Sequence, residues 1–244
     1  DMSSLRLAMV GAAPVPVPLI SGWRDRGVPM LQCFGITEAS GGLNLYLSSA
    51  DAVGKPGSCG KPTLYCDARL VRNDGSEPNP GEVGELLLSG PMVMHGYWHD
   101  RAATEATIVD GWLRTGDLAS RDADGFFTIV DRKKDLIITG GLNVYPAEVE
   151  SALCGCDGIA EAAVVGLPDE RWGEAVVAFV VARPGVDLDP GVVIGACRAR
   201  IADYKTPKRV VIVAELPRTA SGKVRKRVLR EQEGVHSPTP TLAG

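Results

Sequence analysis

The apolar positions in the first fifth of the chain predict alternating strands and a helix. Residues 5–11 fit a short buried strand running into a turn, residues 18–25 fit a helix, and residues 28–35 fit a second strand that ends at a glycine. This order is typical of an α/β layer. Because no strand or helix before residue 5 completes a sheet, we expect a truncated layer.

The polarity pattern changes near residue 54. Residues 64–72 alternate between apolar and polar side chains, and the Asn-Asp-Gly turn that follows favours a hairpin. Residues 84–89 and 126–130 are further short apolar runs next to turn residues. Short strands with frequent turns favour a small antiparallel or barrel-like subdomain.

A mixed pattern begins near residue 131. It predicts strands at 136–139, 162–165, 175–182 and 210–213, and helices at 146–153, 190–202 and 222–231. Pro146 suits a first helical position, and Val193, Cys197 and Ile201 form one apolar stripe. We therefore expect the fold class to be α/β plus α+β. The expected parts are an α/β remnant (1–53), a β-rich subdomain (54–131), a compact α+β domain (132–234) and a disordered tail (235–244).

Composition narrows the classes of function. The chain has 244 residues, 45% hydrophobic and 23% charged, with a net charge of −4. Residues 1–131 carry 10 basic and 16 acidic side chains, and residues 132–244 carry 16 and 14. One basic run, 223–230, has no interleaved aromatic residues, so we expect no nucleic-acid partner.

The longest charge-free strand-like run, 175–182, is too short to span a membrane, so we expect no membrane insertion and a cytoplasmic location. The six cysteines have no zinc-like spacing, which favours reduced thiols.

The first candidate segment is Phe34-Gly35-Ile36-Thr37-Glu38. An aromatic ring beside a glycine can stack on a flat base. A hydroxyl and a carboxylate next to it can hold a phosphate and its Mg²⁺. A plain strand end followed by a helix cap would use the same residue types.

Two further segments carry charge. Asp117 ends Gly111-Trp112-Leu113-Arg114-Thr115-Gly116-Asp117, where a carboxylate in a glycine turn can accept from two vicinal hydroxyls, as on a ribose. A turn aspartate bonded to its own backbone is the simpler reading. Residues 131–135, Asp-Arg-Lys-Lys-Asp, are a dense charge run at an expected domain boundary, and such runs are usually solvated faces.

The last two segments are glycine-rich. Residues 139–146 place Gly140 and Gly141 before a helix, which leaves room for a ligand and backbone donors, although a plain strand-to-helix turn fits as well. Residues 217–223 place Lys223 after Ser-Gly, as a movable positive charge or an ordinary loop lysine.

Taken together, the order and spacing of these five segments resemble the adenylate-forming superfamily. That superfamily includes acyl-CoA synthetases, adenylation domains of peptide synthetases and luciferases. The resemblance extends to about residue 233 and implies a large N-terminal region, a hinge and a small mobile C-terminal domain.

The resemblance also implies roles for individual residues. It implies adenylation chemistry at Lys223, Thr37 and Glu38, with Glu38 as the Mg²⁺ ligand. It places the hinge at Lys134 and coenzyme A binding at Gly140, Gly141 and Leu142. The nucleotide-binding set that it implies is Gly11, Ala12, Ala13, Phe34, Gly35, Ile36, Asp117 and Arg132.

By the same resemblance, the expected activity is that of an AMP-forming acyl-CoA ligase that uses ATP, Mg²⁺ and coenzyme A on a small carboxylic acid, expected to be a fatty acid. Residues 143–150, Asn-Val-Tyr-Pro-Ala-Glu-Val-Glu, resemble the acyl-CoA synthetase branch. Two alternatives stay open. One is an amino- or aryl-acid adenylating enzyme. The other is a non-catalytic nucleotide-binding fragment, because the chain does not contain the family's Ser/Thr/Gly-rich phosphate loop.

Overall fold

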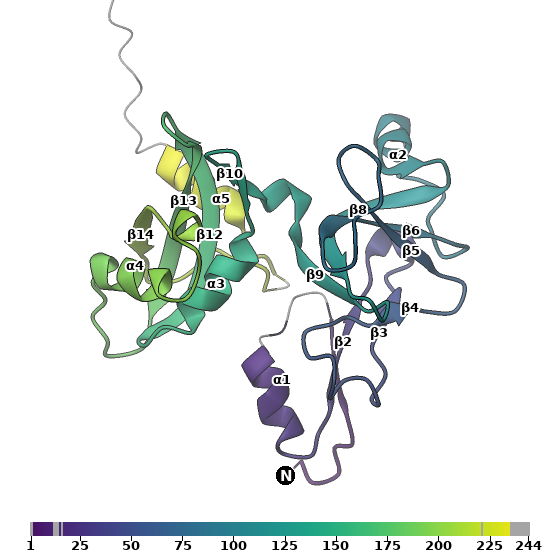
Figure 1. Ribbon diagram of the computed structural model, residues 1–244, viewed down its shortest axis with the longest axis horizontal. Helices are drawn as coiled ribbons and strands as arrows, with labels where there is room; N and C mark the ends of the chain where they lie inside the picture. The colour runs from purple at the N-terminus through teal and green to yellow at the C-terminus, as the bar shows by residue number, and fades with distance from the viewer. Residues whose placement is uncertain (1, 12–14, 16, 221, 235–244) are drawn as a thin grey trace, which may run out of the picture. The chain divides into compact units, whose positions relative to one another are not determined.

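The computed structural model describes residues 2–11, 15, 17–220 and 222–234 (Figure 1). The chain divides into two compact units, Asp1–Lys133 (unit 1) and Lys134–Gly244 (unit 2). Ala12 and Ala13 of the predicted nucleotide-binding turn lie outside the described residues, as does the predicted tail 235–244.

Unit 1 begins with a small mixed sheet in the order β1-β2-β3-β4. Strands β1 (Ala8–Val10) and β2 (Met30–Phe34) are parallel and are connected through helix α1 (Val17–Arg24). The pairings of β2 with β3 (Leu45–Tyr46) and of β3 with β4 (Lys61–Pro62) are antiparallel. The predicted α/β piece is therefore present as one parallel pair with its crossover helix.

The second sheet of unit 1 is wholly antiparallel, in the order β5-β6-β8-β7 with β9 paired to β8. Its strands are β5 (Asp67–Val71), β6 (Val83–Ser89), β7 (Ile108–Val109), β8 (Trp112–Arg121) and β9 (Phe127–Arg132), and helix α2 (Arg101–Thr107) precedes β7. The antiparallel sheet agrees with a β-rich subdomain, and the barrel-like shape stays a prediction. Leu86, Leu88 and Leu113 are fully buried in its core.

The two sheets of unit 1 are joined by residues near Phe127. Gly60 and Phe127 form an isolated antiparallel bridge, and the Ser58 hydroxyl donates to the Phe127 carbonyl at 2.6 Å. Gly60 has a φ of 88°, and a Cβ built on it would lie 1.8 Å from the Tyr46 carbonyl oxygen. Only glycine therefore fits where the chain passes from one sheet to the other.

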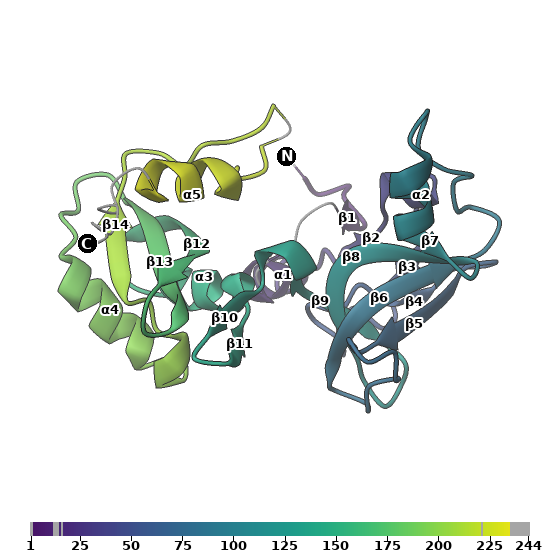
Figure 2. The same cartoon turned by 90° about the horizontal axis from the view of Figure 1, so that it is seen from above.

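Unit 2 is a sheet covered on both faces. The strand order is β11-β10-β13-β12, with β14 parallel to β13. Its strands are β10 (Ile137–Thr139), β11 (Leu142–Val144), β12 (Ile159–Asp169), β13 (Gly173–Ala182) and β14 (Arg209–Ile212). Helices α3 (Pro146–Cys154) and α4 (Pro190–Arg198) pack on one face, and α5 (Lys226–Gly234) lies on the other (Figure 2).

Alternating residues of β13 explain this double covering. Val176, Ala178 and Val180 belong to the core under α3 and α4. Val177 and Phe179 belong to the core under α5. A strand buried on both faces is an almost continuous apolar run, which is the pattern seen at 175–182.

Several elements differ from the sequence expectations. The pattern did not predict α2, β7 or β11, which span only seven, two and three residues. It interpreted residues 111–117 as a turn, whereas Trp112–Arg121 is one strand. The last helix begins at Lys226 rather than near 222, and an isolated antiparallel bridge between Arg218 and Val224 lies before it.

Candidate functional site

The nucleotide-binding residues predicted nearest the N-terminus lie at one edge of the first sheet. Gly11 follows β1, and Gly35 and Ile36 follow Phe34, the last residue of β2. Because β1 and β2 are parallel, their carboxyl ends meet, and a Cβ on Gly11 would lie 3.0 Å from Cys33 Sγ. Carboxyl ends of parallel strands are where such sheets bind ligands.

The Phe34 ring is anchored without being fully enclosed. Phe34 and Ile36 are partly buried and pack against the core of the second sheet, which contains Leu86 and Ala119. The Ile36 N–H donates to Asn44 Oδ1 at 3.2 Å. This bond fixes the turn after β2.

Gly35 is required by close backbone approach. A Cβ at this position would lie 1.7 Å from the Gly42 carbonyl oxygen. Overpacking of this kind costs about 1–3 kcal/mol or more. We expect Gly35→Ala to lower the urea midpoint of unit 1 markedly, whereas Gly54→Ala, whose Cβ would come no closer than 3.9 Å to another atom, leaves it unchanged. Equal midpoints for the two variants would contradict the steric constraint.

Thr37 and Glu38 begin the short 3-10 turn Thr37–Ala39, and a second loop holds this turn. Glu38 Oε1 accepts from the Tyr97 hydroxyl at 2.9 Å, and the Glu38 carbonyl accepts from the Met94 N–H at 2.8 Å. The Ser40 hydroxyl donates to the Met92 carbonyl at 2.8 Å. Burial, together with the bond to Glu38, raises the pKa of Tyr97. The hydroxyl therefore stays protonated and keeps donating to the carboxylate.

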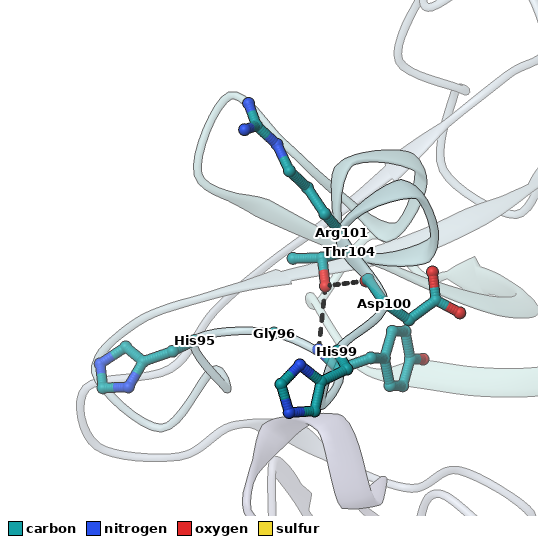
Figure 3. Close-up of a pocket in the computed structure, with 7 residues that line it drawn as sticks. His95, Gly96, His99, Asp100, Arg101 and Thr104 are labelled. Carbon is teal, nitrogen blue, oxygen red and sulfur yellow. Dashed lines mark hydrogen bonds between the residues drawn. The ribbon is translucent and has the colours of Figure 1, made fainter.

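Tyr97 is itself fixed by its own loop. Thr104 Oγ1 accepts from the Tyr97 N–H at 2.9 Å and donates to the Asp100 carbonyl at 2.7 Å (Figure 3). A side chain at Gly96 would lie 2.7 Å from the Thr104 methyl group. This loop borders a shallow hollow lined by His95, His99 and Arg101. No local sequence pattern marks Tyr97, because its partner lies 59 residues away.

Glu38 fits a single-carboxylate Mg²⁺ site. Among the described residues, no group of three or more His, Cys, Asp or Glu side chains could hold a metal ion. Mg²⁺ in nucleotide sites usually takes one or two carboxylates together with phosphate oxygens and water. The Glu38 carboxylate, which is oriented by the Tyr97 hydroxyl, fits such a ligand set, and the Mg²⁺ role of Glu38 stays a prediction.

A β-bulge orients Asp117. The register between β6 and β8 shifts here, and Gly116 has a φ of 69°. Thr115 Oγ1 donates to the Leu86 carbonyl at 2.7 Å and accepts from the Asp117 N–H at 3.0 Å. Bulges re-aim side chains next to functional sites. Gly116 does mark an unusual backbone conformation, as the sequence indicated, but it lies in a bulge inside a strand rather than in a turn.

The structure brings Asp117 and Arg132 together. They are paired across β8 and β9, and Arg132 Nε lies 3.0 Å from Asp117 Oδ1. The Asp117 side chain is 4% exposed and that of Arg132 is 50% exposed. Burial raises the pKa of Cys59 to about 12, and the nearby charge of Asp117 adds a smaller effect. Cys59 belongs to the core on which Phe34 packs.

A second buried carboxylate lies on the neighbouring strand. Glu85 in β6 has a side chain that is 8% exposed. Its Oε2 accepts from Lys133 Nζ at 2.8 Å and from Arg114 Nη1 at 3.3 Å. No local sequence pattern marks Glu85, because its two partners lie 48 and 29 residues away.

Gly140 and Gly141 form the two-residue turn of the β10–β11 hairpin. Thr139 pairs with Leu142, and the glycine φ angles are 57° and 78°. Positive φ at both positions is typical of a type I′ turn. The strand-to-helix turn that the sequence left open as an alternative is therefore wrong here, because β11 lies between the glycines and the helix at Pro146. Leu142 is 49% exposed.

An exposed indole lies against this hairpin. The Gly140 N–H donates to the Trp172 carbonyl at 2.8 Å, and a Cβ on Gly140 would lie 3.1 Å from the Trp172 ring. The Trp172 ring also faces the Arg171 guanidinium at 4.6 Å and Lys208 Nζ at 5.5 Å, measured to the ring centroid. The sequence analysis did not identify this residue.

The predicted hinge residue lies at the boundary of the two units. Lys134 is exposed and is the first residue of unit 2. The next residue, Asp135, is buried and accepts from Arg230 Nη2 at 2.9 Å.

Lys223 lies on a closed turn of unit 2. Arg218 and Val224 form an antiparallel bridge. The Thr219 N–H donates to the Lys223 carbonyl at 2.8 Å, and the Lys223 N–H donates to Thr219 Oγ1 at 3.1 Å. The Lys223 side chain is exposed. These two bonds hold the Lys223 backbone to Thr219 and leave its side chain exposed.

The described part of the chain contains no helix that is long and apolar enough to cross a membrane. All six cysteines are free.

Comparison with known proteins relates these sites to one family. Residues 1–98 match the AMP-binding enzyme family, and residues 148–223 match the AMP-binding enzyme C-terminal domain. The chain is 48% identical to an indoleacetate–CoA ligase of Aromatoleum aromaticum over 231 residues, which is 95% of this chain and 45% of the relative. It is 40% identical to a long-chain-fatty-acid–CoA ligase of Mycobacterium tuberculosis, over 98% of this chain and 47% of the relative.

Solved structures give the same result. The o-succinylbenzoate CoA synthetase of Bacillus subtilis in complex with an acyl-adenylate intermediate superposes with a TM-score of 0.85 at 39% identity, over 95% of this chain and 46% of that one. The same synthetase in complex with ATP and a magnesium ion gives a TM-score of 0.84 at 39% identity, over 94% of this chain and 46% of that one. The chain thus spans about half the length of the relatives that it matches.

Proposed function

This chain belongs to the AMP-binding enzyme family of the adenylate-forming superfamily, and we propose that the protein containing it joins a carboxylic acid to coenzyme A using ATP. The reaction has two steps. The acid first displaces pyrophosphate from ATP to give an acyl-adenylate, and the thiol of coenzyme A then displaces AMP.

Unit 1 supplies the nucleotide site in this proposal. Phe34 stacks on the adenine, and Asp117 accepts from the ribose hydroxyls while Arg132 holds the carboxylate. The bulge at Gly116 supports the role of Asp117, because it holds that carboxylate against Arg132. The bond from the Ile36 N–H to Asn44 supports the role of Phe34, because it fixes the turn after β2. Gly11, Gly35 and Ile36 supply the backbone edge around the base.

The first step brings two anions together. Thr37 binds the phosphate, Glu38 holds the metal ion, and the exposed Lys223 bridges the attacking carboxylate and the α-phosphate. Mg²⁺, when bound, supplies positive charge that offsets the repulsion between these anions. A preorganised donor of the Lys223 kind is worth roughly 2.7–4 kcal/mol in the transition state.

The second step uses a different part of unit 2. The Gly140-Gly141 hairpin lines the path of the pantetheine arm, because its turn leaves open space at Gly141. Beside it, Trp172 with Arg171 and Lys208 offers a flat ring and two cations to the nucleotide end of coenzyme A. Indole faces and guanidinium groups suit adenine and phosphate, respectively.

The single observation that carries this proposal is the distribution of the sites between the units. The nucleotide-binding residues belong to unit 1, whereas Lys223 and the Gly140-Gly141 hairpin belong to unit 2. One mobile unit can present Lys223 for adenylation and the hairpin for thioester formation.

The acid itself is the least constrained part of the proposal. One relative acts on indoleacetate and another on long-chain fatty acids, so we propose a carboxylic acid with a large apolar tail, of either an aryl or a fatty type. A cytoplasmic location agrees with the use of ATP and coenzyme A.

The test uses the protein that contains this chain. Purified protein is incubated with ATP, Mg²⁺ and coenzyme A plus indoleacetate, ferulate or palmitate, and pyrophosphate and the acyl-CoA product are quantified. We expect both products with at least one acid and neither without ATP. Pyrophosphate release without thioester would favour the alternative adenylating enzyme. AMP or ATP binding without either product, across a wider panel of acids, would favour a non-catalytic nucleotide-binding protein.

A further inference from the structure

Two buried carboxylates of unit 1 hold the last two residues before the unit boundary. Arg132 Nε lies 3.0 Å from Asp117 Oδ1, and Lys133 Nζ lies 2.8 Å from Glu85 Oε2. Arg132 ends β9, so the chain leaves the sheet with consecutive residues attached to it.

Glu85 holds Lys133 from two strands away. β9 pairs with β8, and β8 pairs with β6, which carries Glu85. The Lys133 side chain therefore reaches back across β8. Arg114 donates to the same oxygen, Oε2, which balances the charge of the buried acid and fixes its orientation.

The first residue after Lys134, Asp135, is held by an ion pair within unit 2. The Asp135 side chain is 12% exposed and pairs with Arg230 Nη2 at 2.9 Å. Arg230 lies on α5, which is anchored by Leu229, a residue 1% exposed in the core beneath that helix. Asp135 therefore belongs firmly to unit 2.

Lys134 alone separates these two attachments. It is exposed, and among the residues that the structure describes its side chain joins no ion pair. The composition of the charge run 131–135 is typical of a solvated face. In the structure, Arg132 and Lys133 form ion pairs within unit 1, and Asp135 forms one within unit 2.

We propose that Glu85 and Arg230 are positioning residues that hold Lys133 and Asp135 to their own units and so confine rotation between the units to the backbone of Lys134. The proposal rests on the two-step reaction proposed above, in which one unit serves both steps. Confinement to one residue keeps each orientation well defined, because fewer backbone angles are free to vary.

The attachments are tested directly by hydrogen–deuterium exchange on this chain. Glu85→Gln removes the pairs with Lys133 and Arg114, whereas Lys133→Met removes only the first of them. We expect about tenfold faster exchange of amides 132–134 in both variants. Arg230→Met does the same for amides 134–136. The control is Glu77→Gln, which breaks an exposed pair with Arg121 in the same sheet. Unchanged exchange at 132–134 in both Glu85→Gln and Lys133→Met would overturn the proposal.

A second experiment distinguishes positioning from simple stability. In the protein that contains this chain, Lys134→Pro fixes φ at the pivot, and we expect thioester formation to fall about tenfold while adenylation is largely retained. Adding Glu85→Gln frees Lys133 to serve as a substitute pivot, so the double variant should recover thioester formation several-fold. A double variant that is slower than Lys134→Pro would contradict the proposal, because a merely structural role predicts further loss.

The two proposals fail in different ways. If the variants exchange faster but the protein makes no thioester, the proposed function is contradicted and the proposed role of Glu85 and Arg230 is still supported. If the protein makes the thioester but exchange is unchanged in the variants, the proposed function is supported and the proposed role of Glu85 and Arg230 is contradicted.

Discussion

Lys223→Ala should slow acyl-adenylate formation by about 10²-fold or more, measured as pyrophosphate release in the protein that contains this chain. The lysine is exposed, and its turn is closed by its own bonds to Thr219. The substitution therefore removes the charge without removing the backbone that carries it. Removing a lysine from water costs free energy unless the ammonium group pairs with an anion. In the transition state, the carboxylate and the α-phosphate provide that pairing.

The second half-reaction gives the control for this prediction. Thioester formation from supplied acyl-adenylate should survive in Lys223→Ala, because that step uses the Gly140-Gly141 hairpin. Arg227→Ala removes an exposed charge that pairs with Glu231 one turn along the same helix, and it should leave both steps unchanged. Wild-type rates of adenylation in Lys223→Ala would refute the assignment.

Asp117→Ala should raise the KM for ATP by about 10- to 100-fold, because hydrogen bonds to a charged group are worth roughly 1.5–3 kcal/mol. The carboxylate is almost fully buried and ion-paired with Arg132, so a small ligand hydroxyl meets an acceptor that is already oriented. The KM values for the acid and for coenzyme A should stay near those of the wild type. Steady-state kinetics with each substrate varied in turn measures all three.

Loss of stability could imitate this effect, so Glu77→Ala serves as the matched variant. Glu77 pairs with Arg121 at the far end of the same strand, where the pair is exposed. We expect its KM for ATP to be unchanged. If Asp117→Ala also left the KM for ATP unchanged, the ribose assignment would be wrong.

Much of unit 2 was predictable because its two long strands, β12 and β13, are buried on both faces and its helices have clear boundaries. The apolar run at 175–182 lies within β13, and the helix predicted from Pro146 ends within one residue of Cys154. Val193 and Cys197 are buried on the predicted stripe. Apolar periodicity and a proline at the first turn are local signals, so they need no knowledge of the partner elements.

The sequence by itself determined the family resemblance, the mixture of strands and helices, and the glycines that mark special backbone at 116, 140 and 141. Local composition cannot say what those glycines do, because a turn, a bulge and a hairpin use the same residue. The tertiary structure decided that Gly116 belongs to a bulge that orients Asp117. It also decided which distant residues meet: Tyr97 with Glu38, Trp172 with Gly140, and Glu85 with Lys133. These pairings depend on strand order and register, which are set by packing between segments far apart in the chain.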